Sequence, residues 1–158
     1  MNKFEVVLIL NPELATNTLD DEISKFKSNL EAHSAKVINE ENSKVIILNF
    51  GALIDQAIEV AKDLKLTLID MRFVKPLDED ILKEYLSKSD MFISIEDGSI
   101  MGGAGSAVKE FSSKENINIK SLLFGIPDQF IEHASREEML NEAGLSSESI
   151  KSRLKGML

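Results

Sequence analysis

The run Glu96-Asp-Gly-Ser-Ile-Met-Gly-Gly-Ala-Gly-Ser-Ala-Val108 is rich in glycine and directly follows the apolar residues 91–95 (MFISI). A short, continuous apolar run is typical of a strand that is buried on both faces. Glycines before a stretch of helical periodicity are typical of a tight turn into a helix. The run therefore predicts a strand over 91–95, then a strand-to-helix turn, then a helix over about 104–113.

Outward from this turn, strand-like and helix-like stretches alternate along the chain. The predicted strands are residues 45–50 (VIILNF), 66–71 (LTLIDM), 91–95 and 119–124 (IKSLLF). The predicted helices are residues 53–64, 76–86 and 104–113, a helix capped by Ser135 with Glu138 in a capping box, and a last helix capped by Ser146 or Ser147. This alternation predicts an α/β fold with an open, mostly parallel sheet and helices on both faces.

Residues 1–42 show a different pattern. Residues 4–10 (FEVVLIL) predict a strand that ends at the turn Asn11-Pro12, a helix follows, and residues 35–39 predict a second strand. This segment is therefore expected to form a short βαβ unit before the main domain, residues 43–158. No linker rich in Pro, Gly or Ser separates the two parts, so a freely swinging tether is not expected.

Composition excludes several classes of function. The 158 residues include 18 basic and 27 acidic side chains, a net charge of -9, which disfavours a phosphate-neutralising surface for nucleic acid. The chain has no cysteine, which excludes disulfides, thiolate nucleophiles and cysteine-based metal sites. No apolar run approaches the roughly 20 residues of a membrane span, and no signal-peptide pattern opens the sequence, so a cytoplasmic protein is expected.

The glycine loop at 102–105 has two possible roles. The backbone N–H groups of Gly102, Gly103, Ala104 and Gly105 are placed to bind a phosphate or carboxylate at a helix N-terminus. Alternatively, the glycines allow a tight turn and close packing of helix on strand. We favour packing, because no Walker lysine follows and the spacing is not Gly-x-Gly-x-x-Gly.

No residue of this chain is predicted to be catalytic, cofactor-binding or metal-ligating. Neither His33 nor His133 lies in a Ser–His–Asp order, and no third orienting group is evident. His133 follows Glu132 and is conceivable as a general base, but a surface or interface position is the favoured interpretation. A metal site needs three or four converging ligand side chains, and no such set has suitable spacing in this sequence. Glu96 and Asp97 are expected to satisfy the turn amides, with Arg72 and Lys75 as possible ionic partners.

Five apolar residues are candidates for a face that contacts further domains. They are Met101, Phe111, Phe124, Phe130 and Met139. An apolar patch of this kind would promote self-association if it were left uncovered. Packing in the core explains some of these residues equally well.

Three blocks in the second part are similar to one enzyme family. They are residues 69–78 (IDMRFVKPLD), 95–108, and 125–133 (GIPDQFIEH) with 137–145 (EEMLNEAGL). Together they resemble the C-terminal domain of 1-deoxy-D-xylulose-5-phosphate synthase, a transketolase-type transferase of isoprenoid precursor biosynthesis. The resemblance covers about Ser43 to Leu158.

The resemblance implies a supporting role. The parent enzyme condenses pyruvate with glyceraldehyde 3-phosphate, using thiamine diphosphate and Mg²⁺ held between two preceding domains. The family's Gly-Asp-Gly cofactor motif is absent here, and Glu96-Asp97-Gly98 matches it only in part. The resemblance therefore implies a non-catalytic domain that binds no cofactor itself, serves dimerisation or domain support, and pairs with a second copy or with the thiamine-binding domains.

Residues 3–41 resemble a second family. The matching residues are Phe4-Glu-Val-Val, Leu10-Asn-Pro12 and Ala35-Lys-Val-Ile-Asn-Glu. They look like the opening of the bacterial small-subunit ribosomal protein numbered six, whose family has a ferredoxin-like fold. The first alternative is therefore a ribosomal or RNA-associated module, although residues 1–43 hold four lysines against eight acidic residues. The second is an engineered chimera without activity, in which residues 3–39 add an edge strand to the main sheet or pair between chains.

Overall fold

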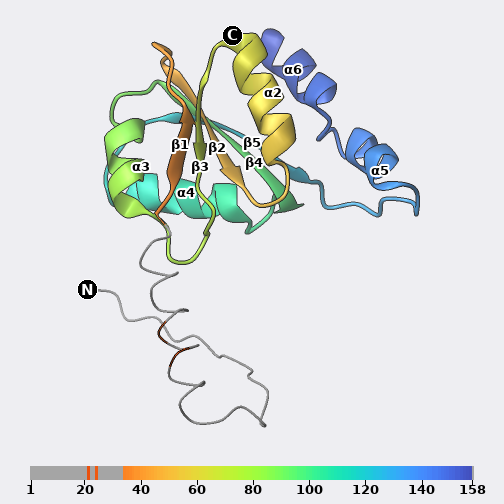
Figure 1. The fold of residues 1–158 in the computed structure, drawn as a ribbon, viewed down its shortest axis with the longest axis horizontal. Helices are drawn as coiled ribbons and strands as arrows, with labels where there is room; N and C mark the ends of the chain where they lie inside the picture. Colours follow the sequence, from red (N-terminus) through yellow and green to blue (C-terminus); the bar gives the residue numbers. More distant parts are fainter. Residues whose placement is uncertain (1–20, 22–23, 25–33, 158) are drawn as a thin grey trace. The chain divides into compact units, whose positions relative to one another are not determined.

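The computed structural model describes Asp21, Ser24 and residues 34–157. The chain forms two compact units, residues 1–34 and 35–158, and the second is the α/β domain drawn in colour in Figure 1. Of the helix predicted in the first segment, only Asp21 and Ser24 are described, and both are helical. The predicted strand 4–10 and the turn at Asn11-Pro12 lie outside the described residues.

The second unit is built on one sheet of five strands in the order β1-β3-β2-β4-β5. The strands are β1 Lys36–Asn39, β2 Val45–Phe50, β3 Thr67–Asp70, β4 Met91–Ser99 and β5 Lys120–Ile126. The helices are α2 Ile54–Leu64, α3 Glu79–Leu86, α4 Ala104–Lys114, α5 Arg136–Glu142 and α6 Ser147–Lys155. All neighbouring strands run parallel except β1 and β3, so the predicted open, mostly parallel sheet is confirmed.

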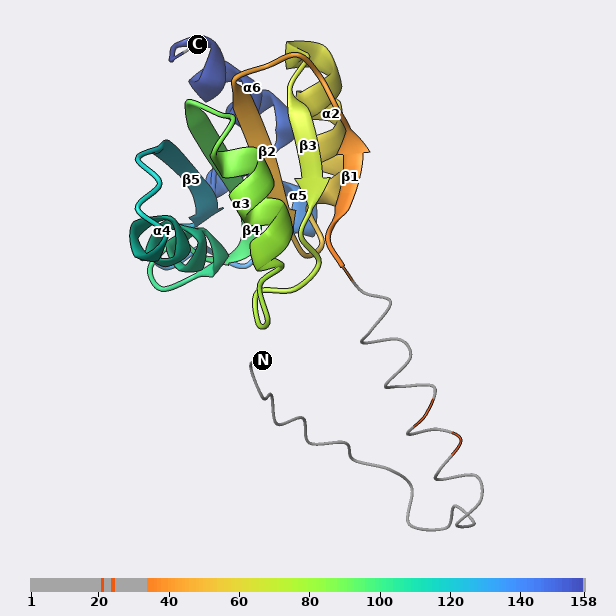
Figure 2. The same cartoon turned by 90° about the vertical axis from the view of Figure 1, so that its left-hand side faces the viewer.

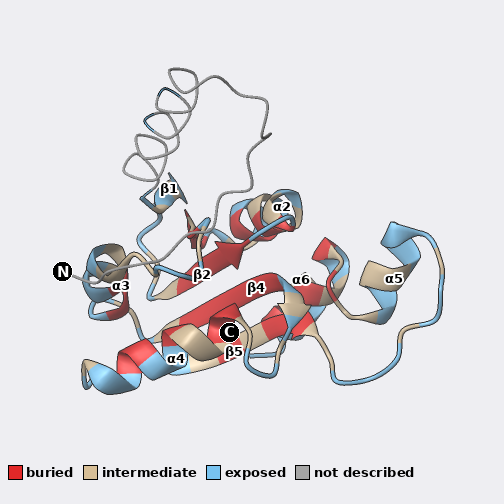
Figure 3. Cartoon of the chain, turned by 90° about the horizontal axis from the view of Figure 1, so that it is seen from below, coloured by how far each residue is buried: buried red, intermediate tan, exposed pale blue. Residues whose placement is uncertain are grey.

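Helices cover both faces of the sheet, as predicted. Successive side chains of a strand point to opposite faces, and in β2 the side chain of Ile47 packs with α2 and α6, while Ile46 and Leu48 pack with α3 and α4. Figure 2 shows α3 and α4 in front of the sheet and α2 and α6 behind it. Figure 3 shows that buried residues concentrate in the sheet and in the inner sides of these helices. Burial on both faces explains why these strands read as continuous apolar runs.

Strand β4 is longer than the sequence predicted. It continues to Ser99, so the first four residues of the glycine run, 96–99, are strand rather than turn. The neighbouring strand β5 also continues, to Ile126, and after a shift in register it pairs with Ser99 and accepts a hydrogen bond from the N–H of Ile100 at 3.1 Å. The turn itself is therefore confined to about residues 100–103.

Strand β1 belongs to the main sheet and forms its antiparallel edge. Lys36 lies opposite Asp70 and Val37 opposite Ile69 in the strand register. The N–H of Glu41 donates to the hydroxyl of Thr67 at 3.0 Å, and that hydroxyl donates to the carbonyl of Glu41 at 3.1 Å. The sequence had assigned this strand to the first segment, and the domain division at residue 42 stays a prediction.

The last helix is tied to α2 by one ammonium group between two carboxylates. Lys151 Nζ lies 2.7 Å from Glu59 Oε1 and 2.9 Å from Asp63 Oδ2. The hydrogen bond to Glu59 raises the pKa of Lys151 above its usual range, and the same bond lowers the pKa of Glu59 below its ordinary value of 4.5. Both shifts mean that the charged pair is favoured when α6 is packed in place.

We predict that Lys151→Gln lowers the melting temperature of the domain at neutral pH. Because the pKa of Glu59 is lowered by folding, its contribution is present above pH 4.5 and is lost as the pH falls below that value. Because the pKa of Lys151 is raised, its contribution is present below pH 10.5 and is lost only at higher pH. Thermal unfolding at neutral and acid pH measures the difference from wild type, which should shrink in acid and in high salt.

Lys109→Gln is the matched control, because Lys109 is exposed on α4 and has no ion-pair partner among the described residues. A difference between Lys151→Gln and wild type that is the same at every pH would contradict an ionic role for Lys151.

Candidate functional site

The carboxylate of Glu96 occupies the N-terminus of α4. Its side chain turns from β4 toward the helix, where Oε2 accepts a hydrogen bond from the N–H of Ala104 at 2.7 Å and Oε1 accepts one from the N–H of Gly105 at 3.0 Å. Glu96 is only 4% exposed. A negative charge is favoured here because the helix dipole and the unpaired amides both face it. The prediction that Glu96 satisfies the turn amides therefore agrees with the geometry.

The glycines around this carboxylate leave no room for side chains. A Cβ on Gly103 would overlap the backbone carbonyl of Ser99 and the carboxylate of Glu96. A Cβ on Gly105 would lie 2.8 Å from Leu123 Cδ2, and one on Gly125 would lie 2.9 Å from the carbonyl oxygen of Gly98. Helix α4 and the ends of β4 and β5 therefore approach at backbone distance, as the packing interpretation of the glycine loop requires.

The same geometry argues against an external anion at the loop. Two of the four amides considered for it, those of Ala104 and Gly105, already bind Glu96. A phosphate placed beside a buried carboxylate would also be repelled by it. The helix N-terminus is satisfied by an anion from the chain itself.

The polar residues that end β2 and β3 interact with one another rather than with Glu96. Asn49 is fully buried, and its Nδ2 donates to the carbonyl of Gly51 at 3.2 Å and to Asp70 Oδ1 at 3.5 Å. Arg72 Nε lies 3.7 Å from Asp70 Oδ2. The hypothesis that Arg72 pairs with Glu96 or Asp97 was therefore wrong, because Asp70 lies two residues before Arg72, whereas both acids of β4 lie two strands away. Asp97 is exposed.

The remaining site predictions concern histidine and metal ligands. His133 is exposed in the loop between β5 and α5, and His33 lies outside the described residues. Among the described residues, no group of three or more His, Cys, Asp or Glu side chains is placed to hold a metal ion. In the same part of the chain, no helix is both long and apolar enough to cross a bilayer.

The five apolar candidates divide into core and surface. Phe111 and Phe124 are 4% and 2% exposed, so of the two alternatives for them core packing agrees with the structure and a contact face does not. The guanidinium of Arg153 lies 5.2 Å from the centre of the Phe124 ring. Met101 is 71% exposed and Phe130 is 102% exposed, while Met139 is half-buried.

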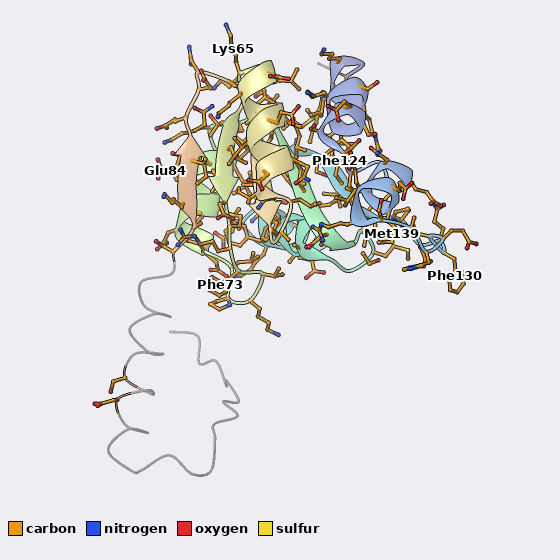
Figure 4. The ribbon with its side chains drawn as sticks, turned by 45° about the vertical axis from the view of Figure 1, so that its right-hand side comes forward. Lys65, Phe73, Glu84, Phe124, Phe130 and Met139 are labelled. Carbon is orange, nitrogen blue, oxygen red and sulfur yellow. The ribbon has the colours of Figure 1, made fainter. Side chains whose placement is uncertain are left out.

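Phe130 stands beside a cavity of about 360 Å³ at the carboxyl ends of β4 and β5. Figure 4 shows Phe130 projecting from the loop before α5, at the same end of the domain as Met139. We call this surface the Phe130 face, and its principal residues are Ile126, Phe130, Ile131, Arg136, Met139 and Leu140. The sequence had pointed to Phe130 and Met139, but not to Arg136 or Ile131. A signal for Arg136 was available, since a basic first residue opposes the dipole of the helix that Ser135 caps.

The family model described as "Transketolase, C-terminal domain" matches residues 33–150. This chain belongs to the transketolase C-terminal domain family. The match confirms the resemblance of the second part and begins earlier than Ser43, with residues that lead into β1. The resemblance of residues 3–41 to a ribosomal protein falls mostly outside the described residues and stays a prediction.

Curated relatives of the domain are named 1-deoxy-D-xylulose-5-phosphate synthase. One from Pseudomonas fluorescens (strain Pf0-1) is 43% identical over 122 residues, which are 77% of this chain and 19% of that protein. One from Blochmanniella floridana is 44% identical over 121 residues, 77% of this chain and 20% of that protein. The chain thus spans about a fifth of the length of the curated relatives it matches.

Two solved structures share the fold. One, described as "Split gene transketolase, inactive beta4 tetramer", has a TM-score of 0.68 and 28% identity and covers 77% of this chain and 40% of its own. The transketolase of Campylobacter jejuni has a TM-score of 0.58 and covers 78% of this chain and 18% of its own. At 16% identity, the second shows the fold alone.

We predict that Glu96→Gln destabilises the domain by about 1–3 kcal/mol, because an uncharged amide cannot replace a charged acceptor at the helix N-terminus. The free energy of unfolding in urea measures this loss. The matched control is Glu110→Gln, since Glu110 is exposed on the same helix and should tolerate the change. Equal effects at the two positions would contradict a special role for the buried carboxylate.

A second prediction tests the packing role of the glycine loop. Gly103→Ala should cost about 1–3 kcal/mol, since the new methyl group meets a backbone carbonyl that cannot rotate away. Gly156→Ala is the control, because Gly156 has a similar φ, -83° against -80°, and its Cβ would have its nearest neighbour at 3.7 Å. Urea unfolding of both variants is the measurement. If Gly103→Ala were as stable as Gly156→Ala, close packing would not be the reason for glycine.

Proposed function

We propose that this chain is the C-terminal domain of a thiamine-diphosphate-dependent 1-deoxy-D-xylulose-5-phosphate synthase, a cytoplasmic enzyme that condenses pyruvate with glyceraldehyde 3-phosphate. The observation that carries the proposal is the identity of 40–44% between three quarters of this chain and about a fifth of each named synthase. In this proposal the domain does no chemistry. It supports the domains that hold the cofactor and contributes to the assembly of the enzyme.

The donor groups of the domain do not suit thiamine diphosphate and Mg²⁺. The helix N-terminus that is most suited to a diphosphate is filled by the carboxylate of Glu96, which would repel it. The partial motif Asp97-Gly98 lies within β4, and the described residues offer no cluster of metal ligands. These features support the view that the cofactor is bound by domains outside this chain.

A role in assembly is supported by one solved relative. The structure described as a split-gene transketolase in an inactive β4 tetramer is similar to this chain over 77% of its length. Those words describe a transketolase chain that self-associates without being active. By analogy, we propose that the present domain assembles with a second copy or with thiamine-binding domains, and that activity requires the latter.

The first test is an assay of the pure chain with pyruvate, glyceraldehyde 3-phosphate, thiamine diphosphate and Mg²⁺. We expect no turnover above background. The second test replaces the C-terminal domain of the Pseudomonas fluorescens synthase with residues 35–158 of this chain, the compact unit described above. We expect this swapped synthase to be active, because the interfaces are those of a close relative.

The control for the swap is the corresponding domain of the Campylobacter jejuni transketolase, which has the same fold at 16% identity to this chain. That domain should not restore activity. An inactive swap with residues 35–158, or turnover by the pure chain, would each overturn the proposed function.

A further inference from the structure

Phe130 is the most exposed large apolar side chain of the described residues, at 102% of its reference area. It lies between two hollows of about 360 and 370 Å³, the first lined by Ile126 and Met139 and the second by Ser99 and Pro127. Figure 4 shows the ring projecting beyond the body of the domain. An exposed aromatic ring beside an apolar cavity is characteristic of a surface that another protein covers.

The composition of the Phe130 face matches that of interface cores. Aromatic residues, methionine and arginine are enriched in protein–protein interfaces, and Phe130, Met139 and Arg136 supply all three around one cavity. Ile126, Ile131 and Leu140 add aliphatic surface, and Asp97 and Gln129 add a polar edge to the same cavity. An apolar side chain of a partner can fill such a cavity and remove both surfaces from water.

The charge of Arg136 is not paired inside the described domain. It is exposed, and it has no ion-pair partner in the part of the chain that the structure describes. It is also the first residue of α5, where the helix dipole disfavours a positive charge. Arg136 lines the cavity beside Phe130 and also a neighbouring hollow of about 500 Å³, which it shares with the acidic residues Asp55, Glu59, Glu137 and Glu148. None of these carboxylates forms an ion pair with Arg136, so its guanidinium is open to a carboxylate on the partner that covers the face.

The identity of the covering partner is indicated by the relatives. In the named synthases this domain is about a fifth of the polypeptide, so four fifths of the enzyme are available to cover it. A second copy is less favoured by charge, because each chain carries a net charge of -9 and two copies repel each other.

We propose that the Phe130 face is the surface on which the thiamine-binding domains of the synthase dock. Phe130 and the cavity beside it provide the apolar centre, and Arg136 pairs with a carboxylate of those domains. This inference rests on the proposed function and adds to it the contact surface and its two principal residues.

The experiment compares Phe130→Ser and Arg136→Gln in the isolated full chain and in the swapped synthase. In the isolated chain both side chains are exposed, so the melting temperature should not change. In the swapped synthase we expect activity to fall at least about tenfold for each variant, as for residues at the centre of an interface. The amides of residues 130–134 should be protected from hydrogen exchange in the swapped synthase and unprotected in the isolated chain.

Met157→Ser is the matched control, because Met157 is also an exposed apolar residue, at 56%, and does not line the cavity. It should leave the activity of the swapped synthase unchanged.

An active swapped synthase that tolerates both substitutions and shows no protection of 130–134 would overturn this inference and leave the proposed function intact. An inactive swap would overturn both. Dissociation of an oligomer of the isolated chain by Phe130→Ser, measured by sedimentation, would assign the face to a second copy and also overturn the inference.

Discussion

The buried carboxylate of Glu96 is the interaction around which the described domain is organised. It comes from the central strand β4 and closes the N-terminus of α4 through two charged hydrogen bonds of 2.7 and 3.0 Å. The bonds are short only because Gly103 and Gly105 let the backbones approach, and Gly125 lets β5 continue past them. One carboxylate thus fixes the packing of α4 on β4 and β5 and leaves that helix end without capacity for another anion.

Local signals made most of the elements predictable. The capping box of Ser135 and Glu138 uses residues three apart, and the apolar strands of the central sheet are continuous because helices cover both faces. Long-range partners were not predictable in this way. The extension of β4 to Ser99 depends on β5, and the salt bridges of Lys151 reach residues about 90 positions away. The ion pair of Arg72 with Asp70 is different, because it joins residues only two positions apart and the sequence prediction overlooked this local partner. Burial was not predictable either: from the sequence, Phe111, Phe124 and Phe130 were grouped as candidates for a contact face, but of the three only Phe130 is exposed.

The edge of the sheet where the strands end, which usually binds a ligand in open α/β folds, has two structural roles in this domain. Carboxyl ends of the strands commonly bind small molecules. In this domain the Glu96 carboxylate, the Asn49 amide nitrogen and Asp70 bind groups of their own chain, and the neighbouring ends of β4 and β5 present a mainly apolar surface instead. A fold with many catalytic members therefore serves here, in our proposal, as a rigid part of a larger enzyme.

The antiparallel strand β1 determines where a gene can be cut to separate this domain from the domains that precede it. A gene cut just before residue 35 leaves the sheet complete, whereas a cut at residue 43 removes β1 and exposes the hydrogen-bonding edge of β3, with Leu68 and Ile69 beside it. A bare apolar strand edge is a template for pairing with other chains. We therefore expect gene fission or fusion to be tolerated before β1, and a break a few residues later to make the protein prone to aggregation.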